Sequence, residues 1–356
     1  MKHAVLVNPK LSGFEYGMLN DFQDEIIDLT GAVPFEAPEN GRFSALQRKV
    51  VHGGRYAFLR PLLRRSGFSL STDVLWVAMM GPENWPLDLY RNWDSHVGFK
   101  ILYLFDTMER HLPSIRRVLK STKWDVTITS FSGAVPLLEA ETGRQWFAVP
   151  QGVKLSRFRP SHDDLRLIDI CSYGRRLDRV HNSLIDLCKN NGWHYEYTTA
   201  TGLAAGTNPT EHYRQYAWHL RHSIFNVCWP VEMTNPQRVR TFSPITCRWF
   251  EAAASGNVIV GRPPSDPGFE ELFGPELVTD VNPDLPDPDM RYFFESLWEN
   301  RAHHLQVARR RHETNSHKWS WRTRVREIER LAGLAQDAPA GDVLVTRAAG
   351  VGSKAI

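Results

Sequence analysis

The chain has 356 residues, of which 42% are hydrophobic and 23% are charged, and its formal net charge is +3. This length supplies enough apolar surface for two ordinary globular domains, and so small a charge excess gives no argument for nucleic-acid binding. The four cysteines (Cys171, Cys188, Cys228, Cys247) contain no Cys-x-x-Cys pair, so we expect free thiols in a reducing cytosol. The N-terminal apolar stretch is too short for a signal peptide, and no apolar run reaches bilayer length. We therefore expect a soluble, cytoplasmic protein.

The first half of the chain alternates short apolar runs with helical patterns. This alternation predicts a doubly wound α/β domain, in which ligands bind beyond the carboxyl ends of the strands. Three polar residues in loops or turns (Glu15, Asp106, Ser132) are candidates for a catalytic base by position only; residues of this kind are more often ordinary loop residues, and we assign no base. The expected strands cover residues 4–7, 74–78, 100–105, 125–129 and 145–149, the expected helices cover 21–29, 109–120 and 133–142, and a loop is expected over 31–41.

The stretch from Arg42 to Arg65 is strongly basic. It carries seven Arg or Lys residues, and no carboxylate lies between residues 43 and 68, while leucine, valine and phenylalanine interleave with the charges. One interpretation is a pair of helices with solvated basic faces. The other is a surface that meets anionic lipid headgroups or an anionic acceptor.

The α/β pattern restarts after a linker over residues 150–160. A second unit of similar size predicts a two-domain enzyme with a cleft. Its expected strands cover residues 165–172, 195–199, 224–228 and 258–260, and its expected helices cover 177–190, 211–221 and 290–311.

Between these elements lies a helix that ends at Gly256. Ser243 and Pro244 are typical of a helix start, and glycine suits the position after a helix end. An exposed helix start beside Arg248 is a site for an anion such as a diphosphate. Glu251 is the single charge in an apolar run and needs a partner, for which a ribose diol is suitable. The alternative is an ordinary amphipathic helix with Glu251 on its solvated side.

The pattern Thr246-x-Arg248-x-Phe250-Glu251-x-x-Ala254-x-Gly256 resembles the donor-site motif of nucleotide-sugar glycosyltransferases of the GT-B type. The resemblance is closest to the spore-maturation glycosyltransferase-like branch, near group 1 (family 4) transferases. Three more segments resemble this family: residues 150–160, Tyr173-Gly174-Arg175 and residues 317–322.

The resemblance implies the GT-B fold, in which two Rossmann-like α/β domains face each other across a cleft. Residues 1–152 would form the N-terminal acceptor-side domain and residues 153–315 the donor domain. Residues 316–332 would form a terminal helix that crosses back to the first domain, and residues 333–356 read as a disordered tail.

The resemblance also implies roles for residues of the second domain. Arg175 and Arg248 would stabilise the leaving diphosphate as catalytic groups. Two departures stand out. Arg179 is the nearest basic residue to the family's usual lysine, one position away from it, and Ser243 stands where group 1 enzymes usually carry a second glutamate. The residues expected to bind the donor are Gly174, Arg179, Ser243, Thr246 and Glu251.

The function expected is a metal-independent transfer of a hexose-type sugar from a nucleoside-diphosphate sugar, most readily a UDP- or GDP-sugar, with no other cofactor. The acceptor is a glycan, a lipid-linked molecule or a small molecule, and no nucleic acid is expected as a partner. Peripheral contact with the inner membrane face would occur through residues 42–65. Two alternatives stay open: a nucleotide-sugar epimerase-like enzyme of the same fold, and an inactive GT-B partner protein. Asp287-Pro288-Asp289 has a metal-binding spacing but is interpreted as a solvated loop.

Overall fold

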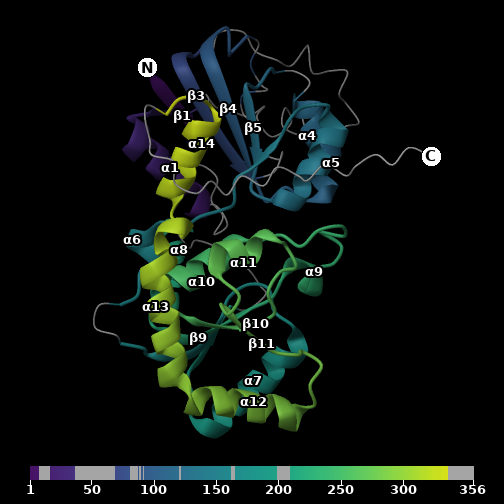
Figure 1. The fold of residues 1–356 in the computed structure, drawn as a ribbon, viewed down its shortest axis with the longest axis vertical. Helices are drawn as coiled ribbons and strands as arrows, with labels where there is room; N and C mark the ends of the chain where they lie inside the picture. The colour runs from purple at the N-terminus through teal and green to yellow at the C-terminus, as the bar shows by residue number, and fades with distance from the viewer. Residues whose placement is uncertain are drawn as a thin grey trace, which may run out of the picture. The chain divides into compact units, whose positions relative to one another are not determined.

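The computed structural model describes residues 1–7, 17–36, 69–80, 87, 90, 92–119, 122–161, 165–198 and 209–335. Glu15, the basic stretch from Arg42 to Arg65 and residues 336–356 of the expected tail lie outside these ranges. The chain divides into two compact units (Figure 1). The first comprises residues 1–11, 22–150 and 325–356, and the second comprises 12–21 and 151–324. The acceptor-side and donor-side roles expected for the two parts stay predictions.

The first unit is built on a parallel sheet. The strands that the structure describes follow the spatial order β2-β1-β3-β4-β5-β6. The short strand β2 lies where a loop is expected, and it pairs with β1 in register Ala4 to Val33. The bounds are β1 (His3–Leu6), β2 (Val33–Phe35), β3 (Ser71–Met80), β4 (His96–Phe105), β5 (Val126–Thr129) and β6 (Phe147–Ala148).

The interior strands of this sheet are apolar on both faces, as a parallel sheet covered by helices requires. On one face Phe22 packs against Tyr103 and Phe105, with ring centroids 5.0 and 5.6 Å away. Helices α4 and α5 contact each other and are drawn side by side in Figure 1. The helical elements are α1 (Gly17–Thr30), η4 (Glu109–His111), α4 (Leu112–Leu119), η5 (Ser132–Ala134) and α5 (Val135–Thr142), and the residues of α1 up to Asp21 belong to the second unit.

The second unit contains its own parallel sheet, in the spatial order β11-β10-β9-β7-β8 among the described strands. Because β8 and β9 flank β7, the direction of winding reverses between β7 and β9. Two parallel α/β sheets in one chain confirm the fold class expected from the sequence. The bounds are β7 (Ile168–Ser172), β8 (Tyr195–Tyr197), β9 (Ser223–Cys228), β10 (Val258–Gly261) and β11 (Val278–Asp280).

The helices of this unit differ from expectation at two places. The helix expected over 290–311 is two helices, α12 and α13, separated at Asn300, and Asp287 to Asp289 form the first turn of α12 instead of a loop. No helix among the described residues is long and apolar enough to cross a membrane. The bounds are α6 (Leu155–Phe158), α7 (Asp178–Asn191), α8 (Pro209–Arg221), α9 (Val231–Thr234), α10 (Cys247–Ala254), α11 (Gly268–Phe273), α12 (Asp287–Glu299), α13 (Arg301–Trp319) and α14 (Trp321–Leu331), and the residues of α14 from Val325 on belong to the first unit.

Two segments that carry the family resemblance lie side by side. Val153, in the linker, forms a parallel β-bridge with Ser320 at the junction of α13 and α14. Its amide donates to the carbonyl of Trp319 at 2.8 Å, and its carbonyl accepts from the amide of Trp321 at 3.1 Å. The fully buried Arg324 adds a bond to the carbonyl of Gln151. The linker is therefore fixed to the end of α13.

Arg166 fastens the amino-terminal end of the second sheet. One terminal nitrogen donates to the carbonyls of Arg221 and Ser223, where α8 passes into β9. The other donates to the carbonyls of Ser255 and Gly256, just after α10. Burial lowers the pKa of this guanidinium to about 10. These four acceptors make Arg166 a structural cation.

Candidate functional site

The candidate site lies at the carboxyl ends of β7 and β9, where the winding of the second sheet reverses. In open α/β sheets this switch point is where ligands bind. Tyr173, Gly174 and Arg175 follow β7 directly, and residues 229–232 follow β9. Ligand-binding residues expected from the sequence therefore meet at the position that the topology favours.

The backbone of Gly174 packs directly against the guanidinium of Arg248. Its φ of +78° lies in the left-handed region, and a Cβ placed there would meet Nη2 of Arg248 at 1.9 Å. Only glycine permits this approach without moving the guanidinium. The amide of Gly174 donates to Oγ1 of Thr198 at 2.7 Å, which fixes the turn. The predicted pair Gly174 and Arg248 is thus brought together from β7 and α10.

Arg175 reaches the start of α10 from the same turn. Its Nη2 donates to Oγ1 of Thr246 at 2.8 Å. Both Arg175 and Arg248 act on the buried Cys228 thiol at the end of β9, where they oppose the effect of burial, which raises the pKa of Cys228 to about 12. Two guanidinium groups therefore concentrate positive charge at the carboxyl ends of β7 and β9.

The start of α10 differs from the sequence prediction. The helix begins at Cys247, and its N-cap is Thr246, whose side chain makes no capping bond. Ser243 lies three residues before this N-cap, outside any helix or strand, and does not cap the helix. Its hydroxyl donates to Oε1 of Glu232 and accepts from the amide of Ser265 at 3.0 Å. Thr246 is buried, and Cys247 and Arg248 are half-buried, so the helix start is less exposed than expected.

Glu251 is buried, with 3% of its surface exposed, and both of its oxygens have protein partners. The Tyr213 hydroxyl donates to Oε1 at 2.8 Å, and the Tyr216 hydroxyl donates to Oε2 at 2.9 Å. The two tyrosines are three residues apart on α8 and so face the same way. Burial raises the pKa of Glu251 above its ordinary value, while the two hydroxyls and Arg248 oppose that shift. The alternative interpretation, in which Glu251 lies on a solvated helix face, is excluded by this burial.

A second buried acid lies near this helix pair. Asp21 is 1% exposed and accepts from Nε and Nη2 of Arg157 at 2.9 and 2.6 Å. The same guanidinium lies over the ring of Tyr213, 5.4 Å from its centroid. Asp21 contributes to the raised pKa of Glu251. The hydrogen-bonded group of Glu251 and its two tyrosines therefore contacts the ion pair of Arg157 and Asp21.

Glu232 is a candidate that the sequence analysis did not identify. It lies in the first turn of α9, two residues after Trp229-Pro230, and holds the hydroxyl of Ser243 on Oε1. Its Oε2 is buried without a hydrogen-bond partner among the described residues. A carboxylate thus stands beside the serine at the position where group 1 enzymes usually have a glutamate. Its position just beyond the carboxyl end of a strand is the signal that could have identified it.

Arg179 is engaged elsewhere. It lies in the first turn of α7, and its Nη2 donates to the carbonyl of Leu285 at 2.7 Å. It lines a shallow cavity of about 330 Å³ with residues of α7 and α12, among them Ser183 and Asp287. Among the described residues, no hydrogen bond joins Arg179 to Gly174 or Arg248. Its donor-binding role stays a prediction.

Two of the polar loop residues in the first unit follow neighbouring strands. Asp106 follows β4 with a φ of +45°, which is uncommon for a residue other than glycine. Its amide donates to Oγ of Ser130 at 3.2 Å, after β5, and Ser132 begins η5. Asp106 and Ser132 therefore belong to neighbouring loops at one edge of the first sheet. Within the described ranges, no group of three or more His, Cys, Asp or Glu side chains could hold a metal ion.

Comparisons with known proteins bear on the family and the fold. Residues 175–330 match the model of a family described as glycosyl transferase-like. A search of curated protein sequences gave no match. The crystal structure of UDP-GlcNAc 2-epimerase from Neisseria meningitidis, bound to UDP-GlcNAc, is similar, with 10% identity and a TM-score of 0.52 over 94% of this chain and 100% of that chain.

Two glycosyltransferase structures match with lower TM-scores. A glycosyltransferase from Rickettsia africae ESF-5 has 11% identity and a TM-score of 0.47 over 93% of this chain and 97% of that one. The calicheamicin glycosyltransferase CalG4 has 13% identity and a TM-score of 0.43 over 94% and 98%. Residues 175–330 are therefore similar to a glycosyl transferase-like family, and the chain's two parallel sheets share their fold with the epimerase.

Proposed function

We propose that the protein is a glycosyltransferase that uses a nucleoside-diphosphate sugar, with UDP- and GDP-sugars as the first donors to test. The observation that carries the proposal is the convergence of Arg175 and Arg248 beside Gly174, at the switch point of a glycosyl transferase-like domain. Transfer breaks the bond between the sugar C1 and the phosphate oxygen. It forms a bond from C1 to the acceptor oxygen, which loses its proton. No residue is assigned as the base.

The two arginines are suited to the diphosphate. As the leaving group departs it gains negative charge, and fixed guanidinium groups stabilise charge that develops in the transition state. Arg248 rests on the backbone of Gly174, and Arg175 is anchored to Thr246, so neither has to be ordered when the ligand arrives. Preorganised donors of this kind lower the barrier more than mobile ones.

Glu251 is proposed to bind the ribose of the donor. A carboxylate offers about four acceptor positions, and two are used by Tyr213 and Tyr216. The tyrosines fix the orientation of the group, and the remaining positions are available to a diol. Glu251→Gln is expected to weaken nucleotide binding, whereas Tyr213→Phe, which removes an internal donor, is expected to lower stability more than affinity.

Glu232 is proposed to contact a hydroxyl of the donor sugar. Its Oε2 is buried without a described partner, and a buried acceptor that stays unpaired is costly. Ser243 holds the other oxygen and so positions the carboxylate. A sugar hydroxyl would supply the missing donor.

The activity can be tested by incubating the protein with a panel of UDP- and GDP-sugars and following the phosphorus NMR spectrum. A transferase releases the nucleoside diphosphate, slowly by hydrolysis and faster when an acceptor is added. An epimerase-like enzyme would convert the sugar without an acceptor, and an inactive partner protein would bind without turnover. Either of those outcomes contradicts the proposal.

Matched variants connect the activity to the site. Arg248→Gln removes a proposed phosphate contact, and we expect turnover to fall by at least about tenfold, because a charged hydrogen bond is worth roughly 1.5–3 kcal/mol. Arg310→Gln changes an exposed arginine on α13 and should leave turnover unchanged. Equal loss in both variants would argue against the assigned site.

Peripheral binding to an anionic membrane through residues 42–65 is a separate proposal. It is supported by the seven basic residues and by the absence of a carboxylate within residues 43–68. Flotation with vesicles containing phosphatidylserine tests it. Binding that is lost at high salt is expected, and an absence of binding at low salt would contradict it.

A further inference from the structure

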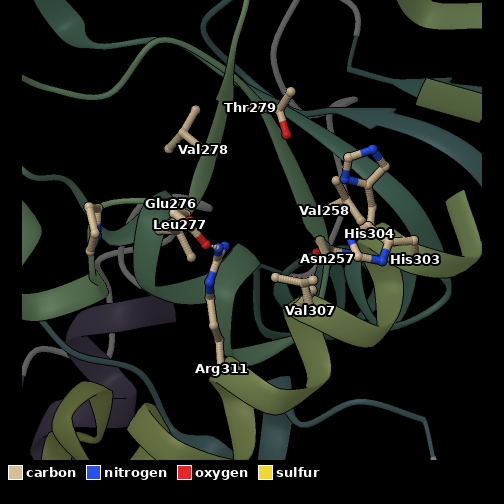
Figure 2. A pocket seen from close by; sticks show the side chains of 12 residues that line it. Asn257, Val258, Glu276, Leu277, Val278, Thr279, His303, His304, Val307 and Arg311 are labelled. Atoms are coloured by element: carbon tan, nitrogen blue, oxygen red, sulfur yellow. Dashed lines mark hydrogen bonds and ion pairs between the residues drawn. The ribbon is translucent and has the colours of Figure 1, made fainter. Parts of the chain in front are cut away.

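A second cavity lies at the opposite end of the second sheet, near the first residues of β10 and β11. Its volume is about 390 Å³, which lies in the range of small-molecule sites. It is lined by Asn257 and Val258 at the start of β10, by residues 275–279 that lead into β11, and by one face of α13 (Figure 2). The proposed donor site lies at the carboxyl ends of the strands, so the two sites are separate.

One face of α13 lines this cavity. His304, Val307, Ala308 and Arg311 recur at the spacing of three and four residues that places side chains on one helical face. Val307 and Ala308 supply a small apolar floor, and Ala308 is itself part of the buried core. His304 and Arg311 stand at either end of that floor. The helix therefore leaves a hollow with a polar side chain at each end.

Arg311 is positioned to bind an anion. Its Nη2 donates to Oε2 of Glu276 at 3.2 Å, but the Glu276 side chain is 83% exposed, so this pair is screened by solvent and weak. Figure 2 shows Arg311 extended toward Glu276 on one side of Val307, with His303 and His304 on the other side. An anion in the cavity could replace the exposed carboxylate at little cost.

Asn257 is an independent observation in support of a polar ligand. The residue is 2% exposed, and its Nδ2 donates to the carbonyls of Leu220 and Ser223, at 2.8 Å each. These bonds fix which end of the amide is the oxygen. Its Oδ1 is buried and has no partner among the described residues, although it belongs to a residue that lines the cavity. A buried carbonyl oxygen of this kind requires a donor.

We propose that this cavity binds a small anion that also carries a hydroxyl group, such as a hydroxycarboxylate or a sugar phosphate. The anionic group lies between Arg311 and the histidines, and the hydroxyl donates to Oδ1 of Asn257. The two sources of this chemistry differ in the charge and size of the anionic group, and the test separates them.

The test is calorimetric titration of the full chain with four probes: malate, succinate, ribose 5-phosphate and inorganic phosphate. Malate and succinate differ by one hydroxyl, so the contact to Asn257 is tested without changing a residue that supports the fold. We expect saturable binding of malate or ribose 5-phosphate, and at least about fivefold weaker binding of the partner probe without the carbon-bound hydroxyl. Equal binding of the two probes in a matched pair overturns the proposal. So does the absence of saturable binding of every probe up to about 10 mM, a concentration that would reveal even weak binding.

Protein variants locate the site. Arg311→Gln is expected to lower the affinity at least about tenfold, the loss of one charge-assisted contact, while Arg310→Gln on the neighbouring exposed face should leave it unchanged. The side-chain NMR signals of His303 and His304 should move when the bound probe saturates. Nucleoside diphosphate binding is measured in the same samples. If it persists while these probes fail to bind, this proposal fails and the proposed function stands.

Discussion

The two ends of the second sheet use arginine in opposite ways. At the amino end, Arg166 spends both terminal nitrogens on four backbone carbonyls and ties α8, β9 and α10 together. At the carboxyl end, Arg175 and Arg248 converge on a glycine turn and a buried helix start. The first arrangement satisfies the hydrogen-bonding capacity of backbone carbonyls. The second concentrates positive charge at the edge where parallel sheets bind their ligands.

The groups around each guanidinium, more than its burial, distinguish the structural Arg166 from the arginines proposed to bind the diphosphate. Arg166 and Arg248 are both partly buried. Carbonyl oxygens surround the guanidinium of Arg166, whereas the guanidinium of Arg248 packs against the backbone of Gly174. Substitutions at the two ends should therefore fail in different assays, and four predictions sharpen that difference.

The largest effect on stability is expected for Arg166→Met. Four carbonyls lose a charged donor, so the free energy of unfolding should fall by about 2–4 kcal/mol in urea denaturation. Arg310→Met is the matched control and should change it by less than about 0.5 kcal/mol. A loss of nucleotide affinity without a loss of stability would reverse the roles of the two ends.

Gly174→Ala should affect binding more than folding. The new Cβ would meet the guanidinium of Arg248, and φ at this position is +78°. We expect nucleoside diphosphate affinity to fall about 10- to 100-fold as Arg248 is displaced, with about 1 kcal/mol of stability lost to strain. Gly192→Ala has a similar φ of +67° and no atom within 4 Å of the added Cβ, so it reproduces the strain alone. Similar nucleoside diphosphate affinities in the two variants would contradict the claim that Gly174 positions Arg248.

Glu251→Gln should change how stability depends on pH. The folded-state pKa of Glu251 is raised above 4.5 by burial. Its contribution to stability is therefore fully present below pH 4.5 and is lost as pH rises through the folded pKa. The glutamine variant does not titrate there, so its unfolding free energy, measured from about pH 4 to pH 8, should gain on that of the wild type as pH rises. A constant difference would show that burial does not control this carboxyl.

Ser243→Ala should produce the smallest effect. It removes the hydroxyl that holds Oε1 of Glu232, worth about 1 kcal/mol, and so loosens the carboxylate. We expect a several-fold fall in turnover with little change in nucleoside diphosphate affinity. Glu232→Gln, run beside it, should lower turnover further. If Ser243→Ala instead weakens nucleoside diphosphate binding, Ser243 contacts the phosphates directly.

The strand and helix rhythm was readable from the sequence because buried parallel strands form short apolar runs. The edge strand β2 was missed because Val33 is exposed and Pro34 interrupts it, as at a sheet edge. The helix over 290–311 was predicted as one because Asn300 is a weak signal for a break. The start of α10 was placed too early because Ser243 and Pro244 satisfy local rules, while the serine has a distant partner in Glu232.

Part of the candidate site could also be predicted from local sequence patterns. Gly174, Arg175, Thr246 and Arg248 carry a motif, and the structure brings them together. The partners of Glu251 were not predictable, because Tyr213 and Tyr216 lie 38 and 35 residues away in sequence. Such long-range pairs depend on how α8 packs against α10, which the residue spacing within either helix does not encode.

The most direct measurement is the affinity difference between a nucleoside diphosphate and its nucleoside. UDP and uridine, and GDP and guanosine, would be titrated into the wild type, the Arg175→Gln, Arg248→Gln double variant and Arg310→Gln. We expect one diphosphate to bind the wild type and Arg310→Gln at least about 100-fold tighter than its nucleoside, and we expect the double variant to lose most of this preference. A preference that survives in the double variant, or no preference in the wild type, would contradict the assignment of the carboxyl end as the diphosphate site.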